Sequence, residues 1–236
     1  MSLPSGVLDV KNRSENWRTA LAFAPFLTNG TTHLLANKLL PGGQFLRGQI
    51  QLELFWSGVR DVLHKRDGTH GRRREDAQRL ATEITGLYAA HFSDLRECVG
   101  SFRVGSRPGF LQLDERSYRV PTSREGQVKF YYEMQNTEID VVLWAPGYLF
   151  VGEMKSESNF GASRKNILVH QLIREYVMAK IALLLRPADE SVAIVPFVVG
   201  EKKRYLHSNS QVGFLVYRGW LRKENVLSWS DLTQVA

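Results

Sequence analysis

The stretch from Thr137 to Glu157, TEIDVVLWAPGYLFVGEMKSE, decides the fold. It contains two runs of β-branched and aromatic residues, VVLW at 141–144 and YLFV at 148–151, which are typical of central β-strands. A Pro-Gly pair at 146–147 separates the runs and indicates a turn. We therefore expect an antiparallel hairpin in this part of the chain.

Charged side chains stand near the ends of both strands. If the turn is centred on the Pro-Gly pair, Asp140 lies opposite Glu153. Glu138 then lies opposite Lys155, on the same face, because side chains alternate along a strand. Opposed carboxylates are costly to bury, so we expect a compensating cation beside them. The Pro-Gly pair also suits a longer loop, and a shift of one residue would send Asp140 and Glu153 to opposite faces.

The composition indicates a globular protein with a basic surface. The chain has 236 residues, of which 43% are hydrophobic and 23% are charged. It carries 31 Lys and Arg residues against 24 Asp and Glu residues, a net charge of +7. This excess favours polyanionic partners, nucleic acid before membrane, and a merely basic surface is the alternative.

The cysteine content and hydropathy point to a cytoplasmic protein without a membrane partner. Cys98 is the only cysteine, which excludes an intrachain disulfide and argues against a Cys-based zinc site. No apolar run reaches the roughly 18 to 20 residues that span a bilayer, and the first residues lack the pattern of a secretory signal. The six histidines show no zinc-protease spacing, and neither a Walker-type loop nor a serine-hydrolase elbow is present.

The rest of the chain alternates helical and extended patterns. We expect short helical pieces in the first 45 residues and a helix cap at Ser163. Hydrophobic spacing predicts helices over residues 48–65, 75–92 and 165–185. The expected additional strands are SFRVG (101–105), GFLQL (109–113), SYRV (117–120), QVKFYYEMQ (127–135), VAIVPFVVG (192–200) and residues 214–217. Pro196 favours an edge position or a bulge for the strand that contains it.

The order of these elements resembles the PD-(D/E)XK nuclease superfamily over residues 75–200. Ile139-Asp140, thirteen residues before Glu153-Met154-Lys155, is similar to the signature Asp followed by Asp/Glu-x-Lys. The resemblance implies an α/β (α+β) fold with a three-layer, restriction-endonuclease-like core, in which helices flank a mixed central sheet. We expect an N-terminal helical extension at 1–70, the nuclease core at 71–200, and a basic loop, strand and tail at 201–236 that complete the same domain.

The resemblance also implies a metal-dependent phosphodiesterase site. Asp140 and Glu153 would bind Mg²⁺, for which Mn²⁺ is expected to substitute, and the carbonyl of Met154 would be a further ligand. Lys155 would hold the attacking water and stabilise developing charge. The alternative for Lys155 is a plain salt bridge to Glu138 or Glu153.

Many such nucleases take one more glutamate from the helix before the core strands. Glu83 is the first choice for this catalytic role, with Glu75 and Glu53 as rivals. An exposed helix glutamate explains Glu83 equally well.

Two further groups of residues are candidates for binding nucleic acid. Some superfamily members carry Gln followed four residues later by Tyr, whereas Gln171 here is followed by Tyr176, one residue too far. Gln171 and Arg174 share a helical face and are expected to approach the substrate, although a boundary between core and solvent explains them as well. Arg72, Arg73 and Arg74 belong to a basic loop that either contacts phosphates or is simply solvated.

Together these features predict a hydrolase, a Mg²⁺-dependent endonuclease or exonuclease, with DNA favoured over RNA as the substrate. The alternative is a catalytically inactive nuclease-fold module that binds nucleic acid or another protein. A homodimer or protein partner would use the N-terminal extension.

Overall fold

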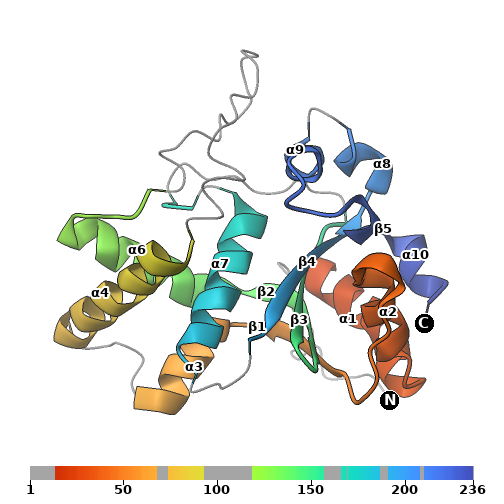
Figure 1. Ribbon diagram of the computed structural model, residues 1–236, viewed down its shortest axis with the longest axis horizontal. Coiled ribbons are helices and arrows are strands. Elements are labelled where there is room, and N and C mark those ends of the chain that lie inside the picture. Colours follow the sequence, from red (N-terminus) through yellow and green to blue (C-terminus); the bar gives the residue numbers. More distant parts are fainter. Residues whose placement is uncertain are drawn as a thin grey trace, which may run out of the picture.

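A five-stranded mixed sheet forms the centre of the molecule (Figure 1). The computed structural model describes residues 14–67, 74–92, 119–156, 166–168, 170–186, 191–207 and 210–235. The strands lie in the order β1-β2-β3-β4-β5. Their bounds are β1 Gln51–Trp56, β2 Ile139–Ala145, β3 Tyr148–Met154, β4 Ala193–Gly200 and β5 Val226–Ser228.

The β2–β3 hairpin has the register expected from the sequence. Val142 faces Val151 and Ala145 faces Tyr148, so the turn consists of Pro146 and Gly147 alone. Gly147 has φ 72, a left-handed conformation that glycine adopts without strain. β1 pairs with β2 antiparallel, whereas β4 and β5 add parallel strands beyond β3. The prediction of a tight antiparallel hairpin is therefore confirmed.

Helices cover both faces of the sheet (Figure 1). One face packs against α3, α4, α6 and α7, and the other against α1, α2 and α10. The small helices α8 and α9 contribute to the α7 side. The helix bounds are α1 Ser14–Thr28, α2 Thr32–Leu39, α3 Gly58–Asp67, α4 Arg74–His91, α6 Arg124–Asn136, α7 Gln171–Leu184, α8 Lys202–Tyr205, α9 Gln211–Tyr217 and α10 Trp229–Thr233, with 3-10 turns at Pro41–Gly43 and Lys223–Asn225.

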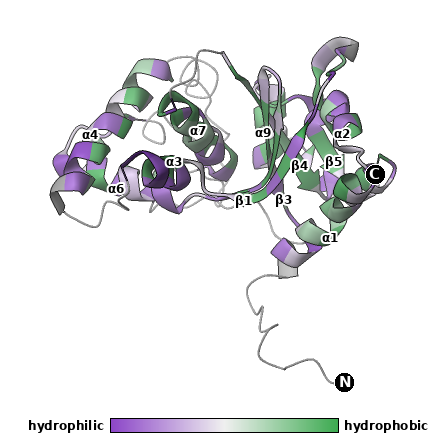
Figure 2. Ribbon diagram, turned by 90° about the horizontal axis from the view of Figure 1, so that it is seen from below, coloured by the Kyte–Doolittle hydropathy of each residue, from purple (hydrophilic) through white to green (hydrophobic). Residues whose placement is uncertain are grey.

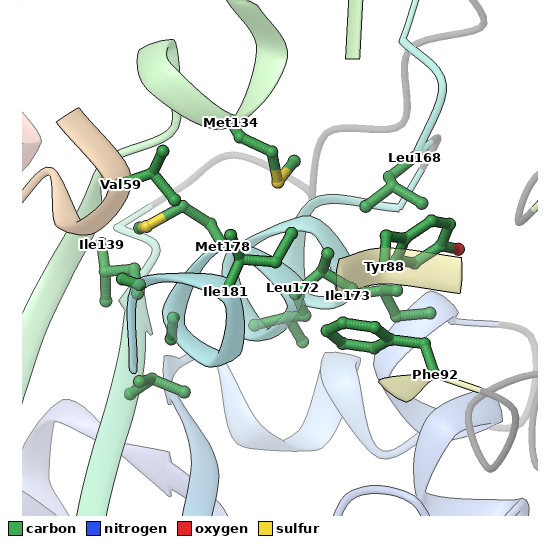
Figure 3. Packing of buried hydrophobic residues seen from close by; sticks show 14 of the residues in the cluster. Val59, Tyr88, Phe92, Met134, Ile139, Leu168, Leu172, Ile173, Met178 and Ile181 are labelled. Atoms are coloured by element: carbon green, nitrogen blue, oxygen red, sulfur yellow. The ribbon is translucent and has the colours of Figure 1, made fainter. Parts of the chain in front are cut away.

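The larger apolar cluster surrounds α7, the crossover helix between β3 and β4. Its side chains interdigitate with those of α3, α4 and α6, as Met178 does with Val59 and Met134 (Figure 3). Tyr88 of α4 and Phe92, which directly follows α4, close the cluster around the first turns of α7, with ring centroids 5.0 Å apart. α3 is hydrophilic over most of its length (Figure 2), because only one stripe of it faces this cluster.

The helix predicted over residues 48–65 is wrong in its first half. The structure has a strand there, β1, followed by α3, so part of the expected N-terminal extension belongs to the sheet and its covering helix. Leu52 and Leu54 alternate as strand residues and pack on the cluster beneath α1 and α2. The apolar residues of this segment recur at helical spacing by coincidence, and hydrogen bonds between its backbone and that of β2 stabilise a strand instead. The short helices predicted nearer the N-terminus are confirmed as α1 and α2.

Two predicted strands are helices. The segment QVKFYYEMQ lies in α6, where Ser123 caps the first turn by accepting a hydrogen bond from Gly126 N at 3.1 Å. Residues 214–217 lie in α9, which Ser210 caps in the same way through Gly213 N at 2.8 Å. In both segments, aromatic and β-branched residues favoured a strand locally, whereas the cap and one buried helical face stabilise a helix.

α7 begins at Gln171 rather than at Lys165, and His170 is its N-cap residue. Ser163, the predicted cap, lies outside the described residues, as do the strands predicted at 101–105 and 109–113 and the first half of SYRV at 117–120. The helix predicted over residues 75–92 is confirmed as α4, and each of its ends agrees to within one residue.

Pro196 does not lie on an edge strand, because β4 runs between β3 and β5. The nearby pairing explains how the strand tolerates it. β5 pairs only with residues from Val198 onward, and the carbonyl of Pro196 accepts a hydrogen bond from Asn225 Nδ2 at 3.0 Å. The N–H that proline lacks would point to the same side as its carbonyl, towards Asn225, where β4 has no paired strand. No hydrogen bond of the sheet is therefore lost. Among the described residues, no helix is long and apolar enough to cross a membrane.

Candidate active site

The open end of the β2–β3 hairpin brings together the charged residues singled out in the sequence. Asp140 is the second residue of β2, and Glu153 is the second-last residue of β3. The pairing of Val142 with Val151 continues to place Asp140 across from Glu153. The backbone N–H of Met154 donates to Asp140 Oδ2 at 2.8 Å, which fixes the aspartate against β3.

Glu153 is a buried carboxylate, with only 2% of its surface exposed. Its Oε1 lies 2.6 Å from Lys155 Nζ and also accepts a hydrogen bond from Gln171 Nε2. Among the described residues, its Oε2 accepts no hydrogen bond, and the neighbouring carboxyl of Glu175 can donate one to Glu153 only when it is protonated. A buried carboxylate oxygen without a partner is costly, so this atom is suited to receive a proton or a cation.

Lys155 is held in place through its backbone. Its N–H donates to the carbonyl of Val199 on β4 at 2.9 Å. Its carbonyl accepts a hydrogen bond from Trp229 Nε1 of α10 at 3.2 Å. A Cβ added at Gly200 would lie 2.7 Å from that same carbonyl, so β4 passes close to it. Strand and helix thus fix the point from which the lysine side chain reaches Glu153.

Glu175 is a site residue that the sequence did not reveal as one. It lies one helical turn after Gln171 on α7 and is only 3% exposed. Burial raises its pKa to about 7, against the opposing influence of its interaction with Glu153, and the negative charge of Asp140 raises it further. The available signal was a glutamate four residues after Gln171, in a strip of α7 that also carries Arg174.

If both were ionised, the buried carboxylates of Glu153 and Glu175 would carry more negative charge than Lys155 can neutralise. Burial raises the pKa of Glu153 well above its usual value, and the neighbouring Glu175 adds to this effect. Lys155 acts in the opposite direction but supplies a single positive charge. At neutral pH and without a further cation, the pair is therefore expected to retain a proton.

The start of α7 is anchored by a partly buried glutamate of α6. Glu133 of α6 accepts hydrogen bonds from the backbone N–H groups of Ile167 at 2.7 Å and Leu168 at 3.0 Å. Arg174 donates to the carbonyl of Leu168 at 3.2 Å. These bonds hold the segment just before α7, and they thereby orient Gln171 towards Glu153.

The other predicted site residues have different surroundings. Glu83 forms an ion pair with Arg66 of α3, with 2.6 Å between Oε1 of Glu83 and Nη1 of Arg66, and a longer one with Arg79 at 3.9 Å. Its rival Glu53 accepts a hydrogen bond from Trp144 Nε1 at 3.0 Å. Neither contact joins the Asp140–Glu153 group.

The basic loop is largely beyond what the structure describes. Arg72 and Arg73 lie outside the described residues, and Arg74 is the first residue of α4 with its side chain undescribed. The side chain of Glu75, the second rival to Glu83, is likewise undescribed. The predicted phosphate contacts of this loop remain predictions.

A divalent cation fits the donor atoms only in part. Across the described part of the chain, no group of three or more His, Cys, Asp or Glu side chains is arranged as metal ligands. Asp140 and Glu153 nevertheless face each other with hard carboxylate oxygens, which Mg²⁺ prefers, and the unpartnered Oε2 of Glu153 is one of them. Comparisons of the chain with protein-family models, curated proteins and solved structures found no match.

Proposed function

We propose that the chain is a metal-dependent nuclease that hydrolyses phosphodiester bonds, with DNA favoured over RNA. The observation that carries the proposal is the convergence of Asp140, Glu153 and Lys155 at the end of the hairpin, where Glu153 is buried and the other two are partly buried. Buried ionic groups with shifted pKa values are typical of functional sites.

Asp140 and Glu153 would hold the metal, with the carbonyl of Met154 as a further ligand. When bound, Mg²⁺ would neutralise phosphate charge and make a water molecule more acidic. Such a cation would also balance the excess of buried carboxylates around Lys155. Glu83 stays a prediction for the additional catalytic carboxylate, and its ion pair with Arg66 weakens that role.

The side chains of this chain would supply the remaining functions. Lys155 Nζ would orient the attacking water and stabilise negative charge that develops on the phosphate oxygens. Gln171 would fix the carboxylate of Glu153 through Oε1, leaving Oε2 open. Arg174 would add positive charge at the same end of α7.

Asp140→Asn and Lys155→Ala test this proposal. We expect each change to lower Mg²⁺- or Mn²⁺-dependent cleavage of oligonucleotides by roughly 100-fold or more, because each removes a group that acts on the transition-state charge. Glu138→Gln is the matched control, since Glu138 is exposed and lies just before β2. Cleavage undiminished in both purified variants would contradict the assignment.

The second candidate is a nuclease-fold module that binds nucleic acid without cutting it. One observation favours it: Glu153 Oε1 is already engaged by Lys155 and Gln171. For such a module we expect salt-sensitive binding, no cleavage with Mg²⁺ or Mn²⁺, and no Mn²⁺ binding in calorimetry. Metal-dependent cleavage by the wild-type protein would exclude it.

A further inference from the structure

Phe55 of β1 has an unusual backbone conformation beside the candidate site. Its φ is 57, and it is the one non-glycine residue with positive φ in the described part of the chain. A side chain larger than hydrogen is strained in this left-handed region, whereas glycine adopts it freely. Strained residues of this kind persist where the surrounding structure imposes them, and they cluster at functional sites.

The strand register places this strained residue directly opposite Asp140. Leu54 pairs with Val141 and Trp56 pairs with Ile139, so Phe55 and Asp140 are the two residues that lie between these pairs, and the ladder skips them. Between these two pairs, the side chains of both strands switch from one face of the sheet to the other. Leu54 and Val141 pack in the cluster beneath α1 and α2. Trp56 and Ile139, two residues away, pack instead in the cluster around α7.

The change of face explains why residue 55 has a left-handed backbone conformation, but it does not explain why this residue is a phenylalanine. A glycine would allow the same twist without strain. The Phe55 ring is only partly buried, and it belongs to neither of the two apolar clusters. Burial in either apolar cluster therefore does not explain an aromatic residue here, across the strands from the aspartate that would act on the phosphodiester.

We propose that Phe55 stacks on an unpaired base adjacent to the bond that is cut, so that the substrate is a nucleic acid that is single-stranded at the cleavage site. The inference rests on the nuclease function proposed above. Aromatic side chains stack on bases of any sequence, but a base inside a duplex is already stacked on its neighbours. A ring beside Asp140 would then select unpaired nucleotides.

The test compares Phe55→Leu, Phe55→Gly and Phe55→Trp with the wild-type protein. Affinity for single-stranded and duplex oligonucleotides is measured in EDTA, which prevents metal-dependent cleavage, with DNA and RNA in separate arms. We expect Phe55→Leu and Phe55→Gly to weaken single-strand binding by about 5- to 150-fold, the range of base stacking, and to leave duplex binding unchanged. Phe55→Trp should retain the affinity.

A matched control and a direct probe separate stacking from a folding defect. Phe45→Leu removes an exposed ring at the turn end of the hairpin, where neighbouring Gln44 accepts a hydrogen bond from Tyr148 OH, and should change nothing. The fluorescence of 2-aminopurine placed next to the cleaved bond should be quenched by the wild-type protein, Phe45→Leu and Phe55→Trp, but not by Phe55→Leu or Phe55→Gly. Thermal unfolding should show that Phe55→Gly is at least as stable as the wild-type protein.

Failure of the inference and failure of the nuclease function have different signatures. If the wild-type protein cleaves oligonucleotides but Phe55→Leu binds single strands as tightly as the wild type, the stacking role is wrong and the nuclease function stands. If the wild-type protein neither cleaves nor binds nucleic acid, both are wrong.

Discussion

Glu153 and Glu175 place two carboxyl groups side by side where both are almost fully buried. In water, each would lose its proton near pH 4.5. Burial favours the protonated form of both groups, the charge of Glu175 adds to this at Glu153 and that of Asp140 at Glu175, and Lys155 offsets only part of the effect on Glu153. The pair therefore lowers the free energy of unfolding at any pH at which both carboxyl groups would be ionised in water.

This arrangement predicts a fold that weakens with rising pH. The folded-state pKa of Glu175 is raised to about 7 from 4.5. The stability that its protonated form confers is fully present below the unfolded value and is lost as pH rises through the folded one. The loss is on the order of 2 to 3 kcal/mol. Urea unfolding of the metal-free protein from pH 4.5 to 8 measures it.

Glu175→Gln should remove most of this dependence, because an amide resembles the protonated acid and does not ionise. At pH 8 the variant should be more stable than the wild-type protein. Glu138→Gln, a change at an exposed glutamate, should leave the pH profile unaltered. A wild-type profile that stays flat between pH 4.5 and 8 would show that the two carboxyl groups are not buried together in solution.

At the scale of elements, the position of α7 determines the site. Its N-cap residue, His170, makes no side-chain capping bond, so the helix start is fixed by other contacts. Glu133 on α6 provides them through the N–H groups of Ile167 and Leu168. Burial raises the pKa of Glu133, while these two bonds act to lower it.

Glu133→Gln should loosen the segment before α7. The variant keeps one acceptor oxygen and loses the second charge-assisted bond, which should lower the free energy of unfolding by about 1 to 2 kcal/mol. Hydrogen exchange should show faster exchange at the amides of Ile167 and Leu168 in particular. Glu125→Gln, an exposed position on the same helix, is the control. Unchanged protection of both amides would contradict the anchoring role.

The sequence predicted the elements whose pattern is unambiguous. The hairpin register followed from the Pro-Gly turn and two apolar runs, and β4 followed from its continuous apolar run. Segments with mixed signals failed. The aromatic residues of α6 favour a strand by propensity, and only the Ser123 cap and the spacing of its buried residues identify the helix. β5, with three residues, is too short to leave a pattern.

The site shows the same division between local and long-range information. Asp140, Glu153 and Lys155 could be found because they lie within one hairpin. Glu175 could not, because its role depends on how α7 crosses the sheet. Glu83 occupies a plausible helix position, yet Arg66 from a neighbouring helix engages it, and that pairing is invisible in the sequence.

At the scale of the whole molecule, positive charge gathers near the candidate site. Lys202, Lys203 and Arg204 of α8 follow β4, whose last residues contact the backbone of Lys155. Lys202 lies 3.4 Å from Asp231, and Arg204 lies 3.8 Å from Glu201. Lys203 is exposed and is the natural residue of this group to meet a phosphate.

Binding of nucleic acid should therefore weaken steeply with salt, and Lys203→Ala should reduce the slope of log affinity against log salt by about 1. Lys65→Ala on α3, at the other end of the molecule (Figure 1), is the comparison. Fluorescence anisotropy between 50 and 200 mM salt measures both slopes. A reduced slope in Lys65→Ala alone would place the contact surface near residues 64–74 instead.

The hydrogen bond from Trp229 to the carbonyl of Lys155 also bears on how the protein is made. Ribosomes add about 5 to 20 residues per second, so the 74 residues from position 155 to position 229 take roughly 4 to 15 s to synthesise. During that interval the hairpin can exist while the lysine backbone still lacks its partner on α10. A nascent chain therefore contains Asp140, Glu153 and Lys155 before the backbone of Lys155 can form its hydrogen bond with Trp229.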